Sequence, residues 1–237
     1  MINSLLGKQL HTAYNSALPF PYIVIDNFIQ DKQFLDIVVK EIENFKDWGR
    51  EGRDHKYQVK KWNTPVDAEN MEQIPPVTRL LLDYFNSPRF IKFVEELTGI
   101  QGLLPDLDMV GGGLHKIASG GKLGVHTDYA QHPQNSSMYR RVNLLLYLNR
   151  NWQADWGGSL QLFEYMTMER KVDVLPMLNR AVLFNTTSVA LHGHPDVLNC
   201  PEDVCRYSIA MYYFTTTPPD NQTFFATEAV WYDHQPQ

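Results

Sequence analysis

Residues 141–149 read RVNLLLYLN, and apolar side chains occupy both faces of the strand that this run predicts. A strand with two apolar faces is typically covered on both sides. Similar short segments, rich in β-branched and aromatic residues and separated by Gly and Pro, surround it. We expect strands near 109–118, 123–128, 141–149, 158–163, 170–175, 180–185, 188–192 and 204–214, with a further one at 222–232. About eight closely spaced short strands are typical of a sandwich, barrel or jelly roll.

The first 105 residues differ, because they combine one short strand at 22–25 with helical patterns. Three helices are expected: at 32–46 with Asp31 as its cap, after Pro75-Pro76, and from Ser87-Pro88 to Gly99. The expected inward residues are Phe34, Val38, Ile42 and Phe45 in the first helix, and Leu80, Leu81 and Tyr84 in the second. The polar stretch 49–73 is predicted to be a loop over a site. We therefore expect one compact domain, in which residues 1–105 support a mainly β core at 106–237.

Composition excludes several classes of protein. The 21 Lys and Arg against 27 Asp and Glu give a net charge of −6, which argues against nucleic acid or an anionic membrane as the main partner. No apolar run approaches the ~20 residues that span a bilayer, and the N-terminus lacks the pattern of a secretory signal. The two cysteines, Cys200 and Cys205, are too few for a disulfide framework. We expect reduced thiols and a cytoplasmic location.

The tripeptide His126-Thr127-Asp128 predicts a metal site. Side chains two residues apart point the same way from a strand, so His126 and Asp128 can bind one cation. His192 or His194 can supply a third ligand; Pro195 favours a turn or strand end at His194, which makes His192 the better strand position. Two imidazoles and one carboxylate on one face of a metal form the facial triad of non-haem Fe(II) oxygenases.

Arg206 and Ser208 lie in an apolar stretch that reads as an interior strand, where they share a face. A buried guanidinium requires an anionic partner, and it can bind a carboxylate through two parallel hydrogen bonds while a Ser hydroxyl adds a third. This pair is suited to holding one end of a dicarboxylic acid.

Several runs, in order along residues 108–217, resemble the 2-oxoglutarate/Fe(II)-dependent dioxygenases of the prolyl-4-hydroxylase-like superfamily. They are GLHKI at 113–117, GGKLGVHTD at 120–128, RRVNLLLYLN at 140–149, WGGSL at 156–160, NRAVLF at 179–184, HGHP at 192–195 and RYS at 206–208. The opening PYIVIDNF at 21–28 also resembles the start of such proteins.

The resemblance implies a double-stranded β-helix, a jelly roll with N-terminal helices packed on one face. It implies that His126, Asp128 and His192 ligate Fe(II), and that Arg206 and Ser208 bind the far carboxylate of 2-oxoglutarate, with Asn143 near that cosubstrate. Many relatives carry a Tyr nine or ten residues before the first ligand. Here those positions hold Ile117 and Lys116, and His115 is a candidate substitute.

The implied reaction couples oxidative decarboxylation of 2-oxoglutarate by O2 to hydroxylation of an unactivated C–H bond, with ascorbate as a reductant. The substrate is expected to be a prolyl residue or a small molecule. Substrate-site candidates are Tyr129, His132, Tyr139, Arg140 and Arg141, which lie in or directly beside an expected loop at 129–140, with Trp62, Trp152 and Trp156. The alternatives are a non-redox, metal-dependent cupin-like isomerase and a binding protein without turnover.

Overall fold

The computed structural model describes residues 2–3, 5–49, 56–64, 72–219 and 226–233. Its helices are α1 (Leu6–Asn15), α2 (Lys32–Asn44), α3 (Pro76–Phe85) and α4 (Pro88–Thr98), with a short 3-10 turn η2 (Ala154–Trp156). Its strands are β1 (Tyr22–Ile25), β2 (Gln58–Thr64), β3 (Leu104–Pro105), β4 (Gly113–Thr127), β5 (Gln131–His132), β6 (Asn135–Tyr147), β7 (Leu160–Phe163), β8 (Arg170–Val174), β9 (Arg180–Asn185), β10 (His192–His194), β11 (Cys205–Thr215) and β12 (Val230–Tyr232).

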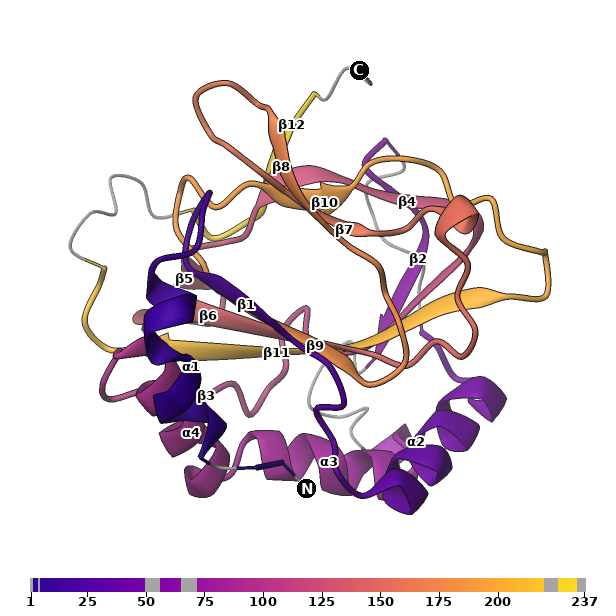
Figure 1. Ribbon diagram of the computed structural model, residues 1–237, viewed down its shortest axis with the longest axis horizontal. Helices are drawn as coiled ribbons and strands as arrows, with labels where there is room; N and C mark the ends of the chain where they lie inside the picture. Colours follow the sequence, from indigo (N-terminus) through magenta and orange to yellow (C-terminus); the bar gives the residue numbers. More distant parts are fainter. Residues whose placement is uncertain (1, 4, 50–55, 65–71, 220–225, 234–237) are drawn as a thin grey trace.

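The strands form one antiparallel sheet folded into two facing layers. Its main path runs β1-β9-β6-β11-β4-β10-β7-β8, and β2 and β12 pair with β4. The layer β1-β9-β6-β11 faces the layer that contains β10, β7 and β8 (Figure 1). This rolled sheet confirms the predicted double-stranded β-helix.

Strand β4 connects the two layers, because its first half pairs with β11 and its second half with β10. Gly120 and Gly121 lie between these halves, and Gly120 adopts a φ of +78° that favours glycine. A Cβ on Gly121 would lie 2.7 Å from the Ala118 carbonyl oxygen and 2.8 Å from that of Val59. The two expected strands at 109–118 and 123–128 are therefore one strand that bends at its glycines.

Helices α2, α3 and α4 cover the outer face of the layer β1-β9-β6-β11 (Figure 1). The largest apolar core lies between them, and it includes Phe90 and Val94 of α4 with Leu144 of β6 and Ile209 of β11. The helices therefore pack on one face of the sheet, as predicted.

The helix boundaries follow their capping residues. Asp31 and Ser87 accept hydrogen bonds from the backbone N–H groups three residues on, at 3.0 and 3.3 Å, and Gly99 ends α4 in the left-handed conformation. Helix α2 is shorter than expected because Phe45 adopts an extended backbone. The prediction for Leu80 was wrong, since it is 57% exposed while Leu81 is buried.

Other differences concern elements that sequence patterns left as loops. Strand β2 lies inside the expected loop at 49–73, of which residues 50–55 and 65–71 fall outside the described part. Strands β5 and β6 form a hairpin within the expected loop at 129–140. Helix α1 was not predicted. None of the helices among the described residues has the length and apolar character needed to cross a bilayer.

Candidate metal centre and cosubstrate cavity

A cavity of about 210 Å³ lies between the two layers of the sheet. Its polar and aromatic lining comes mainly from strands β2, β4, β6, β10, β11 and β12 and from residues beside them: Gln58, Lys61, Asn63, His115, His126, Asp128, Tyr129, Arg140, Asn143, His192, His194, Arg206, Ser208, Tyr212 and Trp231. The cavity therefore brings together several of the buried charged and polar side chains among the described residues.

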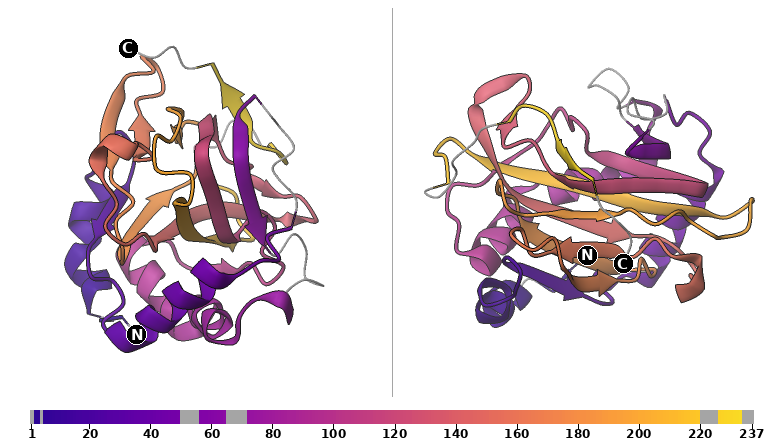
Figure 2. Two further views of the ribbon diagram at one scale, coloured as in Figure 1. Left: turned by 90° about the vertical axis from the view of Figure 1, so that its right-hand side faces the viewer. Right: turned by 90° about the horizontal axis from the view of Figure 1, so that it is seen from above.

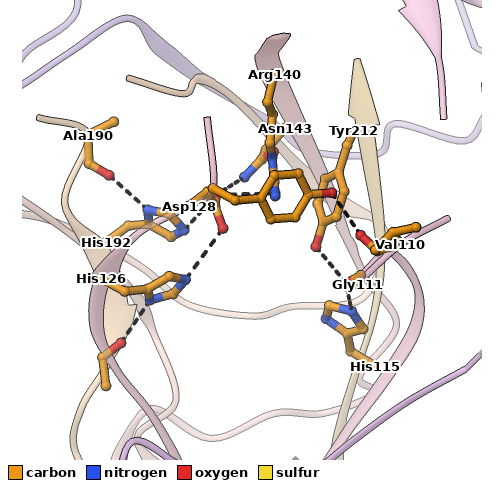
Figure 3. Close-up of polar contacts among 12 residues, drawn as sticks. Val110, Gly111, His115, His126, Asp128, Arg140, Asn143, Ala190, His192 and Tyr212 are labelled. Atoms are coloured by element: carbon orange, nitrogen blue, oxygen red, sulfur yellow. Dashed lines mark hydrogen bonds and ion pairs between the residues drawn. The ribbon is translucent and has the colours of Figure 1, made fainter. Parts of the chain in front are cut away.

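Three side chains meet at one end of this cavity. His126 lies near the end of β4, Asp128 follows that strand, and His192 begins β10 directly opposite His126 in the sheet register. One potential ligand atom from each lies within 4.8 Å of the others. The two Nε2 atoms are 3.6 Å and 3.4 Å from the two carboxylate oxygens of Asp128 (Figure 3).

The orientation of each imidazole is fixed by the backbone. Nδ1 of His126 lies 2.9 Å from the Gly124 carbonyl oxygen, and Nδ1 of His192 lies 2.9 Å from that of Ala190 (Figure 3). A carbonyl oxygen only accepts, so each Nδ1 carries the proton and donates it. Each Nε2 therefore presents a lone pair toward Asp128, as a metal ligand requires.

The Asp128 carboxylate is held by Asn143 and Arg140. Its Oδ2 accepts a 2.6 Å hydrogen bond from Asn143 Nδ2 and lies 3.2 Å from Arg140 Nη2. Arg140 Nε in turn donates to Asn143 Oδ1 at 2.8 Å, and its guanidinium lies between the rings of Tyr129 and Tyr212. Asn143 and Arg140 therefore fix the position of the carboxylate.

The protonation states suit a cation site. Burial opposes ionisation of Asp128, but Arg140 and the two histidines hold the pKa of this carboxyl well below its ordinary value. Burial and the neighbouring His126 lower the pKa of His192 to about 4. An ionised carboxylate and a neutral imidazole are the forms that bind a metal.

Arg206 and Ser208 line another part of the cavity from β11, and both are buried. The Arg206 Nε donates to the Gly158 carbonyl oxygen at 2.8 Å, and its guanidinium lies 4.9 Å from the Tyr147 ring centre. It forms no ion pair with a carboxylate of the described residues, and burial lowers its pKa. The anionic partner that a buried Arg requires is thus not one of these side chains.

The structure brings the predicted ligand candidates together and separates the two histidines of the LHGHP segment. His194 also lines the cavity but is not part of the three-residue cluster, and both of its buried ring nitrogens lack hydrogen-bond partners. His115 lines the cavity too, with Nε2 bonded to the Gly111 carbonyl oxygen at 2.9 Å. Asn143 contacts Asp128, and its proposed contact with a cosubstrate stays a prediction.

The predicted substrate-site residues divide into two groups. Tyr129 and Arg140 line the cavity. The others do not: His132 pairs with Asp106, Arg141 bonds Thr215, Trp152 packs on Trp156, Trp62 packs at the main core, and Tyr139 lies in the β5-β6 hairpin.

Sequence analysis missed several polar and aromatic residues of the cavity, and Gln58, Lys61 and Asn63 among them come from the unpredicted strand β2. Two others are Tyr212, on the same face of β11 as Arg206, and Trp231 of β12, whose ring centre lies 4.8 Å from that of His126. Strand periodicity extended from Arg206 would have found Tyr212.

Comparisons with known proteins agree with this geometry. The family model of the 2OG-Fe(II) oxygenase superfamily matches residues 112–214. Prolyl 3-hydroxylase OGFOD1 of Mus musculus is 28% identical over 228 residues, which cover 92% of this chain and 37% of the mouse protein. The chain therefore spans little more than a third of that relative's length.

Two solved structures share the fold. A prolyl hydroxylase from Trichoplax adhaerens, in complex with a hypoxia inducible factor oxygen degradation domain peptide fragment, superposes with a TM-score of 0.59 at 16% identity, covering 89% of this chain and 90% of that one. HygX from Streptomyces hygroscopicus, with nickel and 2-oxoglutarate bound, gives 0.59 at 15% identity, covering 96% of each chain. Residues 112–214 therefore match the 2OG-Fe(II) oxygenase superfamily, and the chain shares the fold of the solved prolyl hydroxylase and of HygX.

Proposed function

We propose that this chain is an Fe(II)- and 2-oxoglutarate-dependent oxygenase that hydroxylates a prolyl residue of a protein or peptide. The observation that carries the proposal is the convergence of His126, Asp128 and His192 within 4.8 Å, inside a buried cavity that also contains Arg206. A non-redox cupin-like isomerase would use the same three ligands, but it has no need for a buried guanidinium that lacks an acidic partner.

The donor set fits Fe(II). Two imidazole Nε2 atoms and one carboxylate on a single face of the ion match a facial triad, which leaves positions open for a cosubstrate and O2. Fe(II), when bound, supplies the oxidative chemistry. The chain's own groups do the rest: backbone carbonyls fix both imidazoles, and Asn143 and Arg140 orient the carboxylate.

Arg206 is proposed to bind the far carboxylate of 2-oxoglutarate, with Ser208 as a further hydrogen-bond donor. Both side chains face the cavity from one strand, and a guanidinium can bind a carboxylate through two bonds at once. A dianion at this position would neutralise a buried charge.

A prolyl substrate is supported by the names of the mouse and Trichoplax relatives and by the aromatic lining of the cavity. Tyr129, Tyr212 and Trp231 line the cavity that contains the triad, and aromatic side chains pack well against the C–H groups of a pyrrolidine ring. A small-molecule substrate is the other outcome of the test below. The proposal also includes ascorbate as the reductant. It places the protein in the cytoplasm, where the free cysteines Cys200 and Cys205 would stay reduced.

The test measures succinate released from 2-oxoglutarate with added Fe(II), with and without a synthetic peptide library that has a central proline. The proposal predicts succinate release that the library stimulates, with hydroxyproline in the recovered peptides. If amino acids or sugars stimulate succinate release and peptides do not, the substrate is a small molecule rather than a peptide. Metal binding without any succinate would support the non-redox alternative.

The ligand assignment is tested by iron content. His126→Ala and Asp128→Ala are expected to abolish stoichiometric Fe(II) binding, while the control His11→Ala, at an exposed histidine of α1, keeps it. His192→Ala should lose the metal and His194→Ala should retain it. Full iron occupancy in the His126 variant would reject the assignment.

A further inference from the structure

A second buried cation, Lys61 of β2, faces the same cavity as Arg206. Its side chain is 8% exposed, and it forms no ion pair with a carboxylate of the described residues. Burial, followed by the charge of Arg206, lowers its pKa to about 8. Leaving an ammonium group in such a place costs stability unless an anion binds there.

The sheet register places Lys61 and Arg206 on the same wall. Both lie opposite Ile117 of β4, Lys61 on one side and Arg206 on the other. Residues in register on neighbouring strands point to the same face, so these two side chains flank Ile117 inside the cavity. Strand β2 (purple) runs alongside β4 in the left view of Figure 2.

A bulge in β2 is what turns Lys61 inward. The register shifts between Val59 and Lys61, and Lys60 adopts a φ of +47°. Lys60 then donates to the Ser119 carbonyl oxygen at 2.9 Å, whereas Gln58 and Lys61 both line the cavity. Strict alternation would not place residues three apart on one face.

The other charged groups of the cavity do not satisfy this pair. Asp128, the buried carboxylate of the triad, is already engaged by Arg140 and Asn143. His194, near Lys61 and Arg206, has two buried ring nitrogens without partners. This part of the cavity therefore contains several donors and no acidic acceptor among the described side chains.

We infer that Lys61 is a second cationic ligand for the far carboxylate of 2-oxoglutarate, so that β2 and β11 bind this carboxylate together. His194 lies where it can add a hydrogen bond. The inference rests on the proposed function, because it requires a keto dicarboxylate in the cavity. It assigns selectivity for a dicarboxylic over a monocarboxylic keto acid to two residues, one of them outside the segment matched by the family model.

The test is calorimetric titration of the full chain loaded with Mn(II), which replaces Fe(II) without supporting turnover. The titrants are 2-oxoglutarate and 2-oxopentanoate, which has the same chain length but ends in a methyl group. The variants are Lys61→Met and Lys61→Arg, with Lys122→Met as a control because Lys122 pairs with Val59 and lines a different pocket, away from the cavity.

Lys61→Met is expected to weaken 2-oxoglutarate binding by about tenfold to a hundredfold, as for loss of a charge-assisted hydrogen bond, and to change 2-oxopentanoate binding less than about twofold. Lys61→Arg should retain part of the affinity. The melting temperature of unliganded Lys61→Met should equal or exceed that of wild type, since an unpaired buried charge is removed.

Equal losses for both keto acids, or no loss for either, would overturn the role of Lys61 while leaving the proposed function intact. If the Mn(II)-loaded wild type binds no 2-oxoglutarate, the proposed function itself fails and this inference with it.

Discussion

At the scale of single residues, two buried asparagines have different tasks. Asn143 connects Arg140 to Asp128 through both ends of its amide, at 2.8 and 2.6 Å. Asn149, in contrast, bonds only backbone groups, of Pro176 and Tyr207. Only the first acts on a proposed metal ligand.

Asn143→Ala is expected to reduce Fe(II) affinity by about tenfold to a hundredfold, because groups that orient a ligand contribute about that much. Asn149→Ala should lower the melting temperature and leave metal affinity unchanged. Competitive chelator titration and thermal unfolding of both variants measure the two effects. Equal metal affinity in the two variants would remove the orienting role of Asn143.

Sequence analysis named His126, Asp128 and Arg206, which line one cavity in the structure, because period-2 spacing on a strand indicates which side chains share a face. It missed Lys61 because the bulge at Lys60 breaks that period and because a polar stretch with turn residues reads as a loop. Pairing with β4, a contact distant in sequence, is what makes β2 a strand.

At the scale of elements, the bend of β4 brings Arg206 and His126, which belong to different layers, to a common cavity. Helix ends were predictable from Asp31, Ser87 and Gly99, which act locally. The buried face of α3 could not be predicted in the same way. Three consecutive leucines do not determine which of them face the sheet, and Leu82 rather than Leu80 is buried.

Gly121→Ala is expected to destabilise the protein by more than about 2 kcal/mol, because its Cβ would meet backbone oxygens that cannot move cheaply. Gly102→Ala is the control: its φ of +71° is unfavourable for Ala, but nothing lies within 4 Å of the added Cβ. Its cost should be about 1 kcal/mol. Urea denaturation measures both, and equal losses would mean that β4 tolerates a side chain at its bend.

At the scale of the whole molecule, the helices form a support beneath the sheet that carries the site. Phe90 of α4 is fully buried and contacts the rings of Phe28, Phe85, Phe93 and Tyr213, the last on β11. Phe90 thus packs against Tyr213, which belongs to the same strand as Arg206.

Phe90→Ala should cost about 3–5 kcal/mol of unfolding free energy, and Leu80→Ala on the exposed side of α3 about 0.5 kcal/mol or less. Chemical denaturation measures both. Below the unfolding transition, Phe90→Ala should still bind Fe(II), because no triad residue touches this core. A small effect at Phe90 would contradict its place in the support.

The pairing of β2 with β4 has a consequence for defining the working unit. An excised polypeptide of residues 106–237 would keep the whole stretch recognisable by family, yet it would lack Gln58, Lys61 and Asn63. Without β2, the backbone N–H and C=O groups of β4 that pair with it would be unpaired, and such an exposed strand edge promotes aggregation. If Lys61 binds 2-oxoglutarate as inferred, the smallest fragment that binds this cosubstrate fully must include β2, which lies outside the segment matched by the family model.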